Sequence, residues 1–67
     1  MKQAYIEATF PDLKVKDAYQ TGRGRGSSAR IAVGRAFGDL LKKVSGKRIG
    51  SIKATIIISD VIEEEGQ

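Results

Sequence analysis

The stretch "ARIAVGRAFGDLLKKV", residues 29–44, decides the fold because the hydrophobic period changes there. With successive residues placed at about 100° intervals, its apolar side chains share one arc and most of its charged ones lie outside it. The pattern predicts an amphipathic helix over residues 28–45. Ser27 or Ser28 can cap its start, and Gly46 can supply the left-handed residue that ends it. The apolar arc consists of Ala29, Val33, Ala36, Phe37, Leu40, Leu41 and Val44.

The sequence before this helix alternates with a period of two, which is typical of half-buried strands. Residues 2–10 predict a first strand. The break at Pro11 and Asp12 indicates a turn, and the less regular alternation of residues 13–20 predicts a second strand at the edge of a sheet. One face of the first strand carries Ala4, Ile6, Ala8 and Phe10, and the other carries Gln3, Tyr5, Glu7 and Thr9.

The sequence after the helix, residues 49–62, is the most apolar part of the chain and predicts a third strand. Its isoleucines fall on both faces. A single helix covers only one face of a three-stranded sheet, so we expect Ile57 and Val61, together with Tyr5, to stay exposed to water. Such an apolar patch favours self-association.

These elements predict an α+β fold, a small ββαβ unit. The crossover rules favour an antiparallel three-stranded sheet of order 2-1-3, with the helix on one face. We expect homo-oligomerisation to complete it, and pairing of the third strand with its copy is one way to do so. Residues 1–62 are expected to form one domain with a flexible Gly/Arg loop at 21–27, followed by an acidic, frayed tail at 63–67. The expected core is Ile6, Phe37, Leu40, Leu41, Ile56 and Ile58.

Composition limits what could stabilise so short a chain. Its 67 residues include no cysteine and no histidine, so neither a disulfide nor a thiolate or imidazole metal site is available. We therefore expect no metal and no cofactor, and self-association remains as a source of stability. No stretch is apolar enough to suggest a membrane span, and we expect a cytoplasmic protein.

The net charge of +4 is unevenly distributed. Four of the eight acidic residues lie at positions 60–67, so the rest of the chain holds twelve basic and only four acidic residues. A body this basic attracts polyanions, of which nucleic acid, DNA or RNA, is the most common in a cell. The alternative is that the charge serves solubility.

The stretch "TGRGRGSS", residues 21–28, is predicted to join the second strand to the helix. The N–H groups of a helix start favour anions, glycines allow close approach, and two arginine side chains provide donors suited to phosphate oxygens. A second basic cluster is expected at the far end of the helix. The predicted phosphate-binding residues are Arg23, Arg25, Ser27, Ser28 and Arg30 at the start, and Lys42, Lys43, Lys47 and Arg48 at the end.

From Gly24, the fourteen residues "GRGSSARIAVGRAF" resemble the turn and second helix of double-stranded RNA-binding domains. Where those domains have paired lysines, this chain has Ser28 and Ala29, and a strand follows where those domains end. Arg30 is the only basic residue near that position, and the resemblance implies only that this helix start meets phosphate.

Gly34 and Gly38 each cost about 1 kcal/mol relative to alanine within a helix, so they need a reason. Four residues apart, they form a smooth notch. This notch either seats the helix on its own sheet or contacts another subunit, and the predicted oligomer interface is Gly34, Gly38, Ile57 and Val61.

Three functions are consistent with these features. The first is a non-enzymatic nucleic-acid-binding homo-oligomer, in which only the tyrosines could stack on bases. The second is an assembly module whose charge is incidental. The third is a binder of a small phosphorylated ligand at the Gly/Arg loop. No arrangement of nucleophile and base suggests an enzyme.

Overall fold

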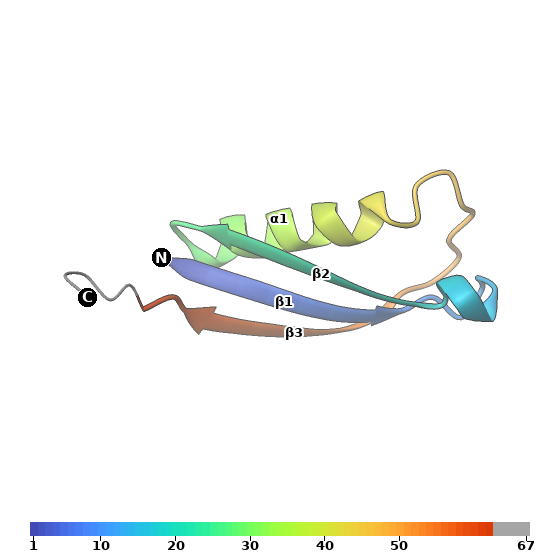
Figure 1. The fold of residues 1–67 in the computed structure, drawn as a ribbon, viewed down its shortest axis with the longest axis horizontal. Helices are drawn as coiled ribbons and strands as arrows, with labels where there is room; N and C mark the ends of the chain where they lie inside the picture. The colour runs from blue at the N-terminus through green and yellow to red at the C-terminus, as the bar shows by residue number, and fades with distance from the viewer. Residues whose placement is uncertain (63–67) are drawn as a thin grey trace.

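The chain forms a strand, a second strand, a helix and a third strand in the computed structural model, which describes residues 1–62 (Figure 1). The predicted acidic tail at 63–67 lies outside the described residues. The elements are β1 (Lys2–Thr9), the short 3₁₀ helix η1 (Val15–Asp17), β2 (Tyr19–Gly26), α1 (Ala29–Lys42) and β3 (Lys53–Asp60).

The sheet has the predicted order β2-β1-β3, and both pairs of neighbours are antiparallel. The helix packs on one face, so the α+β class and the topology are confirmed (Figure 1). Ile6 of β1 lies opposite Gly22 of β2 and Ile56 of β3. The even-numbered residues of all three strands therefore point toward the helix, and the odd-numbered ones point away from it.

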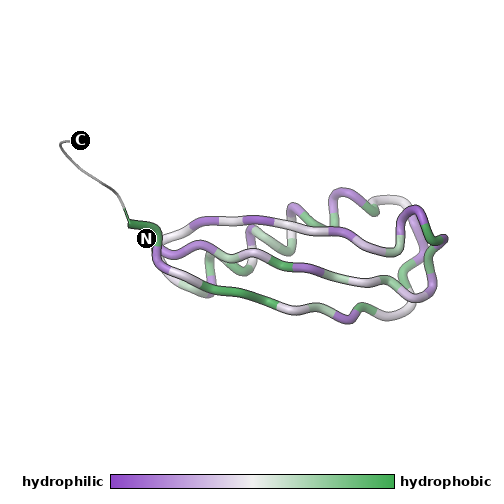
Figure 2. Tube along the Cα trace, turned by 60° about the horizontal axis from the view of Figure 1, so that its bottom comes forward, coloured by the Kyte–Doolittle hydropathy of each residue, from purple (hydrophilic) through white to green (hydrophobic). Residues whose placement is uncertain are grey.

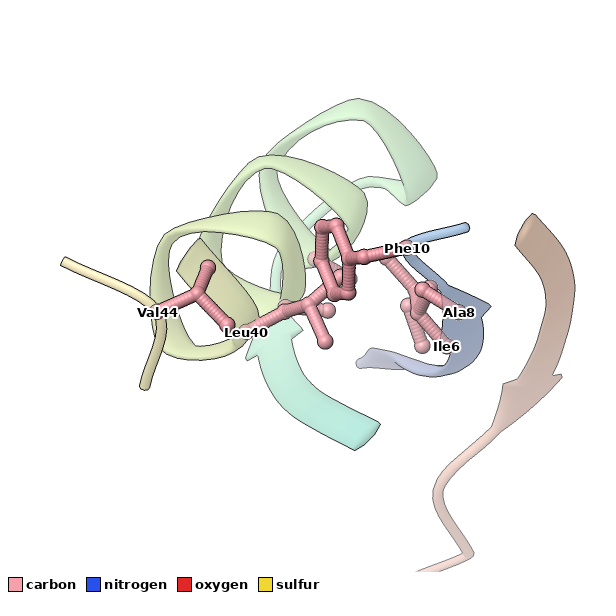
Figure 3. Packing of buried hydrophobic residues seen from close by; sticks show 8 residues of the cluster. Ile6, Ala8, Phe10, Leu40 and Val44 are labelled. Carbon is pink, nitrogen blue, oxygen red and sulfur yellow. The ribbon is translucent and has the colours of Figure 1, made fainter. Parts of the chain in front are cut away.

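The core lies between β1 and the helix, as Figure 3 shows. Ile6 and Leu40 are fully buried, as predicted, whereas Phe37 is only partly buried and Leu41, Ile56 and Ile58 are exposed. The predictions for Leu41, Ile56 and Ile58 are wrong because the helix lies over β2 and β1 and barely reaches β3. The prediction for Phe37 is confirmed in part, since its side chain packs against the buried cluster. The buried set is Ala4, Ile6, Ala8, Phe10, Ala32, Ala36, Leu40 and Val44.

The Gly/Arg stretch is strand β2 and not a flexible loop, which corrects the prediction for residues 21–27. The strand predicted at 13–20 is also wrong, because most of that stretch forms a turn and η1. The alternate glycines explain the difference, since they let β2 pass directly beneath the helix. A Cβ atom at Gly22 would overlap the carbonyl oxygen of Ala36, and one at Gly24 would lie 2.5 Å from the carbonyl oxygen of Ala32.

The helix begins as the sequence predicts. Ser28 is its N-cap, and its Oγ accepts a hydrogen bond of 3.3 Å from the N–H of Ile31. Gly46 has a φ of 83° in the turn that follows the helix. A Cβ atom at Gly34 or Gly38 would meet nothing within 4 Å, so the notch does not seat the helix on its own sheet. Within residues 1–62, no helix has the length and apolar character needed to cross a membrane.

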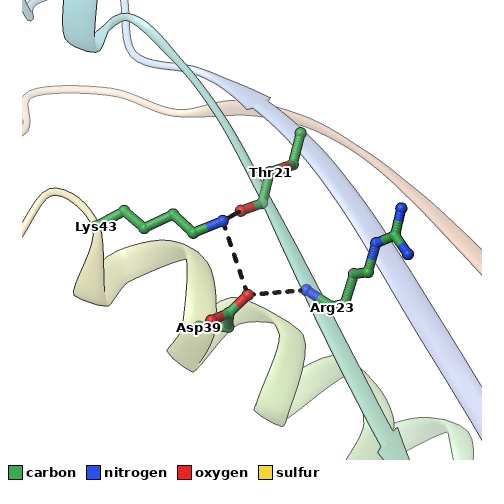
Figure 4. Close-up of polar contacts among 4 residues, drawn as sticks. All are labelled: Thr21, Arg23, Asp39 and Lys43. Carbon is green, nitrogen blue, oxygen red and sulfur yellow. Dashed lines mark hydrogen bonds and ion pairs between the residues drawn. The ribbon is translucent and has the colours of Figure 1, made fainter.

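The outer edge of β2 is covered by three helix side chains, Arg35, Asp39 and Lys43, which we call the edge-capping row. Lys43 Nζ donates to the carbonyl oxygen of Thr21 at 2.6 Å, and the N–H of Arg23 donates to Asp39 Oδ2 at 3.2 Å (Figure 4). Arg35 Nη1 donates to another outward carbonyl, that of residue 25, at 2.8 Å. These bonds use the backbone groups that would otherwise pair with another strand.

Candidate nucleic-acid interface

The open face of the sheet, opposite the helix, carries the odd-numbered side chains of the strands. Because β2 has glycine at positions 22, 24 and 26, its larger side chains in that stretch all belong to this face. The members of the open face are Gln3, Tyr5, Glu7 and Thr9 from β1, Tyr19, Thr21, Arg23 and Arg25 from β2, and Lys53, Thr55, Ile57 and Ser59 from β3.

Tyr5 is the centre of this face. Its cross-strand neighbours are Arg23 on one side and Ile57 on the other. The guanidinium carbon of Arg23 lies over the Tyr5 ring, 5.0 Å from its centroid. A cation–π contact of this kind is worth about 0.5–1 kcal/mol at an exposed site. The pair therefore presents a flat, positively charged surface.

A second row of cross-strand neighbours, Gln3 and Arg25, lies beside the row of Tyr5 and Arg23. Arg25 lies opposite Gln3, whose Nε2 donates to Ser59 Oγ at 3.3 Å. Both arginines, with Gln3 and Tyr5, line an open depression of about 520 Å³.

The Glu7 carboxylate accepts hydrogen bonds from both tyrosines of the chain. Its Oε2 accepts hydrogen bonds from the Tyr5 hydroxyl at 3.4 Å and the Tyr19 hydroxyl at 3.2 Å. Partial desolvation and the negative charge of Glu7 raise the pKa of Tyr19 above its ordinary value of 10.0. The carboxylate thus orients two aromatic rings on the same face.

Replacing Glu7 with glutamine is expected to lower the Tyr19 pKa toward its ordinary value, because the charge that opposes tyrosinate is removed. An NMR titration of the Tyr19 ring signals measures the change. In the wild type, the folded state keeps the Tyr19 hydroxyl proton at a pH where the unfolded state loses it. Stability should therefore fall as the pH rises through about 10 toward the folded pKa. An unchanged Tyr19 pKa in the variant would contradict the contact.

Among the described residues, the open face holds three cations, Arg23, Arg25 and Lys53, and one carboxylate, Glu7. Both arginine side chains are exposed. The face is therefore positive and bears two tyrosines.

The structure separates the predicted phosphate-binding residues into different surfaces. Arg23 and Arg25 lie on the open face, whereas Ser27, Ser28 and Arg30 lie at the start of the helix, on the other side of the sheet. The remaining four, Lys42, Lys43, Lys47 and Arg48, lie at or beyond its far end.

Two of the lysines at the far end of the helix already have partners within the chain. Lys43 belongs to the edge-capping row, and Lys47 Nζ lies 3.4 Å from Asp17 Oδ2. These contacts tie the end of the helix to β2 and η1. All four basic residues there are exposed, and within residues 1–62 Lys42 and Arg48 are the two without a side-chain partner.

The predicted interface residues are separated as well. Gly34 and Gly38 lie on the exposed side of the helix, whereas Ile57 lies on the open face. Val61 follows β3, and its N–H donates to the carbonyl oxygen of Met1 at 2.9 Å. The structure does not bring these four residues together as one surface.

Sequence reasoning did not identify Gln3 and Lys53 as members of the site. The signal that could have found them is the alternation of glycine with larger residues in "TGRGRG", residues 21–26, read as a strand. Comparisons with protein-family models, curated proteins and solved structures return no match to this chain. Its function is therefore inferred from the open face itself.

Proposed function

We propose that this protein binds single-stranded nucleic acid on the open face of its sheet, without catalysing a reaction. Tyr5 and Arg23 would stack on bases, Arg25 and Lys53 would contact phosphates, and Gln3 would hydrogen-bond to base edges. The chain would act as a homo-oligomer.

The observation that carries this proposal is the stack of the Arg23 guanidinium on the Tyr5 ring, with Arg25 in the adjacent row. Aromatic rings and arginine planes are the groups on which proteins stack unpaired bases, and arginine also bonds phosphate through two parallel N–H groups. Base stacking is worth about 1–3 kcal/mol per base. A flat sheet face gives a strand of nucleic acid room to lie along it.

The charge of the protein supports the same partner. The net charge is +4, and Arg23, Arg25 and Lys53 add a local positive field on the open face. Such a field raises the rate of encounter with a polyanion. A small phosphorylated ligand is less favoured, because β2 does not form a glycine loop around the helix start.

Replacing Arg23 and Arg25 with alanine is expected to weaken binding and to flatten its salt dependence. Each lost phosphate contact on a single strand removes about 0.7 from the log–log slope, so the loss of Arg25 should lower the slope by about 0.7, and the loss of Arg23 should weaken base stacking. Fluorescence anisotropy of a labelled single-stranded oligonucleotide over a salt series measures this slope. Stability should change little, since both side chains are exposed.

The matched control is Arg30→Ala with Lys42→Ala, which removes the same charge from the helix side. It should leave most of the slope intact. An equal loss in both double variants would transfer the site to the helix ends, and tighter binding of a duplex would contradict the preference for single strands. If the wild-type protein does not bind either form at about 0.1 M salt, the proposed function is wrong.

Assembly is the second candidate function, and the exposure of β3 favours it. All eight residues of this strand are exposed, including three consecutive isoleucines. An assembly module would use this strand as its working surface, with or without nucleic acid.

A further inference from the structure

The strand β3 has three consecutive isoleucines at its centre, and within residues 1–62 both of its faces are exposed. Ile56 is 42% exposed, Ile57 52% and Ile58 46%, because the helix lies over the other two strands. Figure 2 shows a continuous hydrophobic run along this strand. A long apolar strand at the edge of a sheet is a strong template for pairing with another strand.

The outer edges of β2 and β3 differ in whether side chains bond to their outward backbone groups. The edge-capping row bonds to three of the outward backbone groups of β2, namely the carbonyls of residues 21 and 25 and the N–H of residue 23. Within residues 1–62, a single side chain bonds to the backbone of β3. The Thr9 hydroxyl of β1 donates to the carbonyl oxygen of Lys53, which faces β1 and not the free edge. The outer edge of β3 thus lacks the protection that the helix gives to β2.

The hydrogen-bond pattern identifies which groups of β3 point outward. The N–H of Val61 donates to Met1, the residue that precedes β1. Residues of an antiparallel strand bond alternately to one side and the other, so Ile57 and the other odd-numbered residues bond to β1. The even-numbered residues Ala54, Ile56, Ile58 and Asp60 therefore direct their N–H and C=O groups to the free edge.

The sequence of β3 and its flanks is symmetric about Ile57 at three pairs of positions and differs at two, where Lys53 would lie opposite Val61 and Ala54 opposite Asp60. If β3 met its own copy antiparallel with Ile57 at the centre, Ile56 would lie opposite the partner's Ile58. In the same register, residues 55 and 59 bring a threonine opposite a serine, and residues 52 and 62 bring two isoleucines together. Asp60 would lie opposite the small Ala54. Shifting the centre to either neighbour would place Asp60 opposite an isoleucine, which is costly for a desolvated carboxylate.

We propose that β3 pairs with β3 of a second copy about a two-fold axis through Ile57, which makes one continuous six-stranded sheet. The axis is perpendicular to the sheet, so both helices lie on one face and both open faces join on the other. Because Ile57 bonds to β1, the two Ile57 residues form a pair without mutual hydrogen bonds, with Cβ atoms about 4.5–5.5 Å apart. Hydrogen-bonded pairs of Ile56 with the partner's Ile58 flank it.

Ile57→Cys tests the axis directly, since the chain has no other cysteine. A cysteine on the two-fold axis meets its own copy at a separation that a disulfide can span, so mild oxidation should cross-link the variant into dimers. Ile56→Cys is the matched control, equally exposed on the neighbouring position. Its copy lies diagonally, about 7 Å away, so it should cross-link at least about 10-fold more slowly.

Ile58→Pro tests the backbone pairing. Proline removes an N–H that points to the free edge and leaves the bonds between β1 and β3 intact. Two symmetric hydrogen bonds are lost across the interface, so the dimer dissociation constant should rise by about 100-fold. Sedimentation equilibrium measures the constant, and circular dichroism verifies that the variant is folded. If Ile58→Pro does not fold, the cysteine pair still decides the question.

Other results would overturn the pairing. A wild-type chain that stays monomeric up to about 100 μM would leave this edge to a strand of another protein. Equal cross-linking by both cysteine variants would exclude a two-fold axis at Ile57. A dimer that survives Ile58→Pro but dissociates in Gly34→Leu would place the interface at the helix notch. All measurements are made without oligonucleotide, so failure here and failure of nucleic-acid binding are distinguishable.

Discussion

Gly24→Ala is expected to lower the free energy of unfolding by about 3 kcal/mol, the upper part of the range for overpacked sites. The added methyl group would collide with the backbone of Ala36 and lie 2.5 Å from the carbonyl oxygen of Ala32. Backbone atoms cannot move aside as the end of a flexible side chain can, so the helix would have to lift from β2. For a domain of this size, such a loss is a large part of the total stability.

The matched control is Gly34→Ala, in which the same methyl group is added where nothing lies within 4 Å. This variant should gain about 1 kcal/mol, the difference in helix propensity between glycine and alanine. Urea denaturation at one protein concentration compares the three proteins. Equal stability of Gly24→Ala and wild type would show that the helix does not lie this close to β2.

Phe10→Ala is expected to cost about 4 kcal/mol, within the range found when a buried phenylalanine is removed. Phe10 is the largest of the fully buried side chains, and it fills the end of the core beside Leu40 and Val44 (Figure 3). Its backbone N–H also donates to the carbonyl oxygen of Ala18 at 2.7 Å, where the chain enters β2. The cavity would therefore loosen both the core and the start of that strand.

Val15→Ala removes apolar volume nearby from a side chain that is 93% exposed, and its cost should be within about 0.5 kcal/mol. Thermal unfolding followed by circular dichroism compares the two variants. If Phe10→Ala and Val15→Ala proved equally mild, the aromatic ring would not be part of the core.

The sequence predicts β1, the helix and the strand order well, because their signals are carried by side chains. Ala4, Ile6 and Ala8 alternate with polar residues, and the change to a period of 3.6 is clear. The same method fails for β2, because its inward positions after Gln20 are Gly22, Gly24 and Gly26, which have no side chains. Hydrophobic alternation is therefore absent, and glycine suggests a loop.

The position of the helix explains the errors in the predicted core. A period of 3.6 indicates which side of a helix is buried, but not over which strand it lies. Contact between the β2 glycines and the small residues Ala32 and Ala36 holds the helix over β2. Ile56 and Ile58 are left uncovered as a result.

The candidate site was partly predicted. Arg23, Arg25 and the tyrosines were identified as the groups able to contact phosphate and stack on bases. Their grouping on one face depends on the register of β1 against β2, which pairs Tyr5 with Arg23 across 18 positions of sequence. Periodicity within a strand contains no information on register between strands.

The edge-capping row also limits how far the molecule can polymerise. Each sheet edge with unprotected backbone groups can pair with one further strand. Arg35, Asp39 and Lys43 bond to three outward backbone groups of β2, so this edge is less available for strand pairing than the edge of β3. If the proposed pairing uses β3 alone, each copy has one partner and the assembly ends as a dimer, whereas pairing at both edges would extend it into a fibre. A chain with so apolar a third strand can thus remain a finite particle.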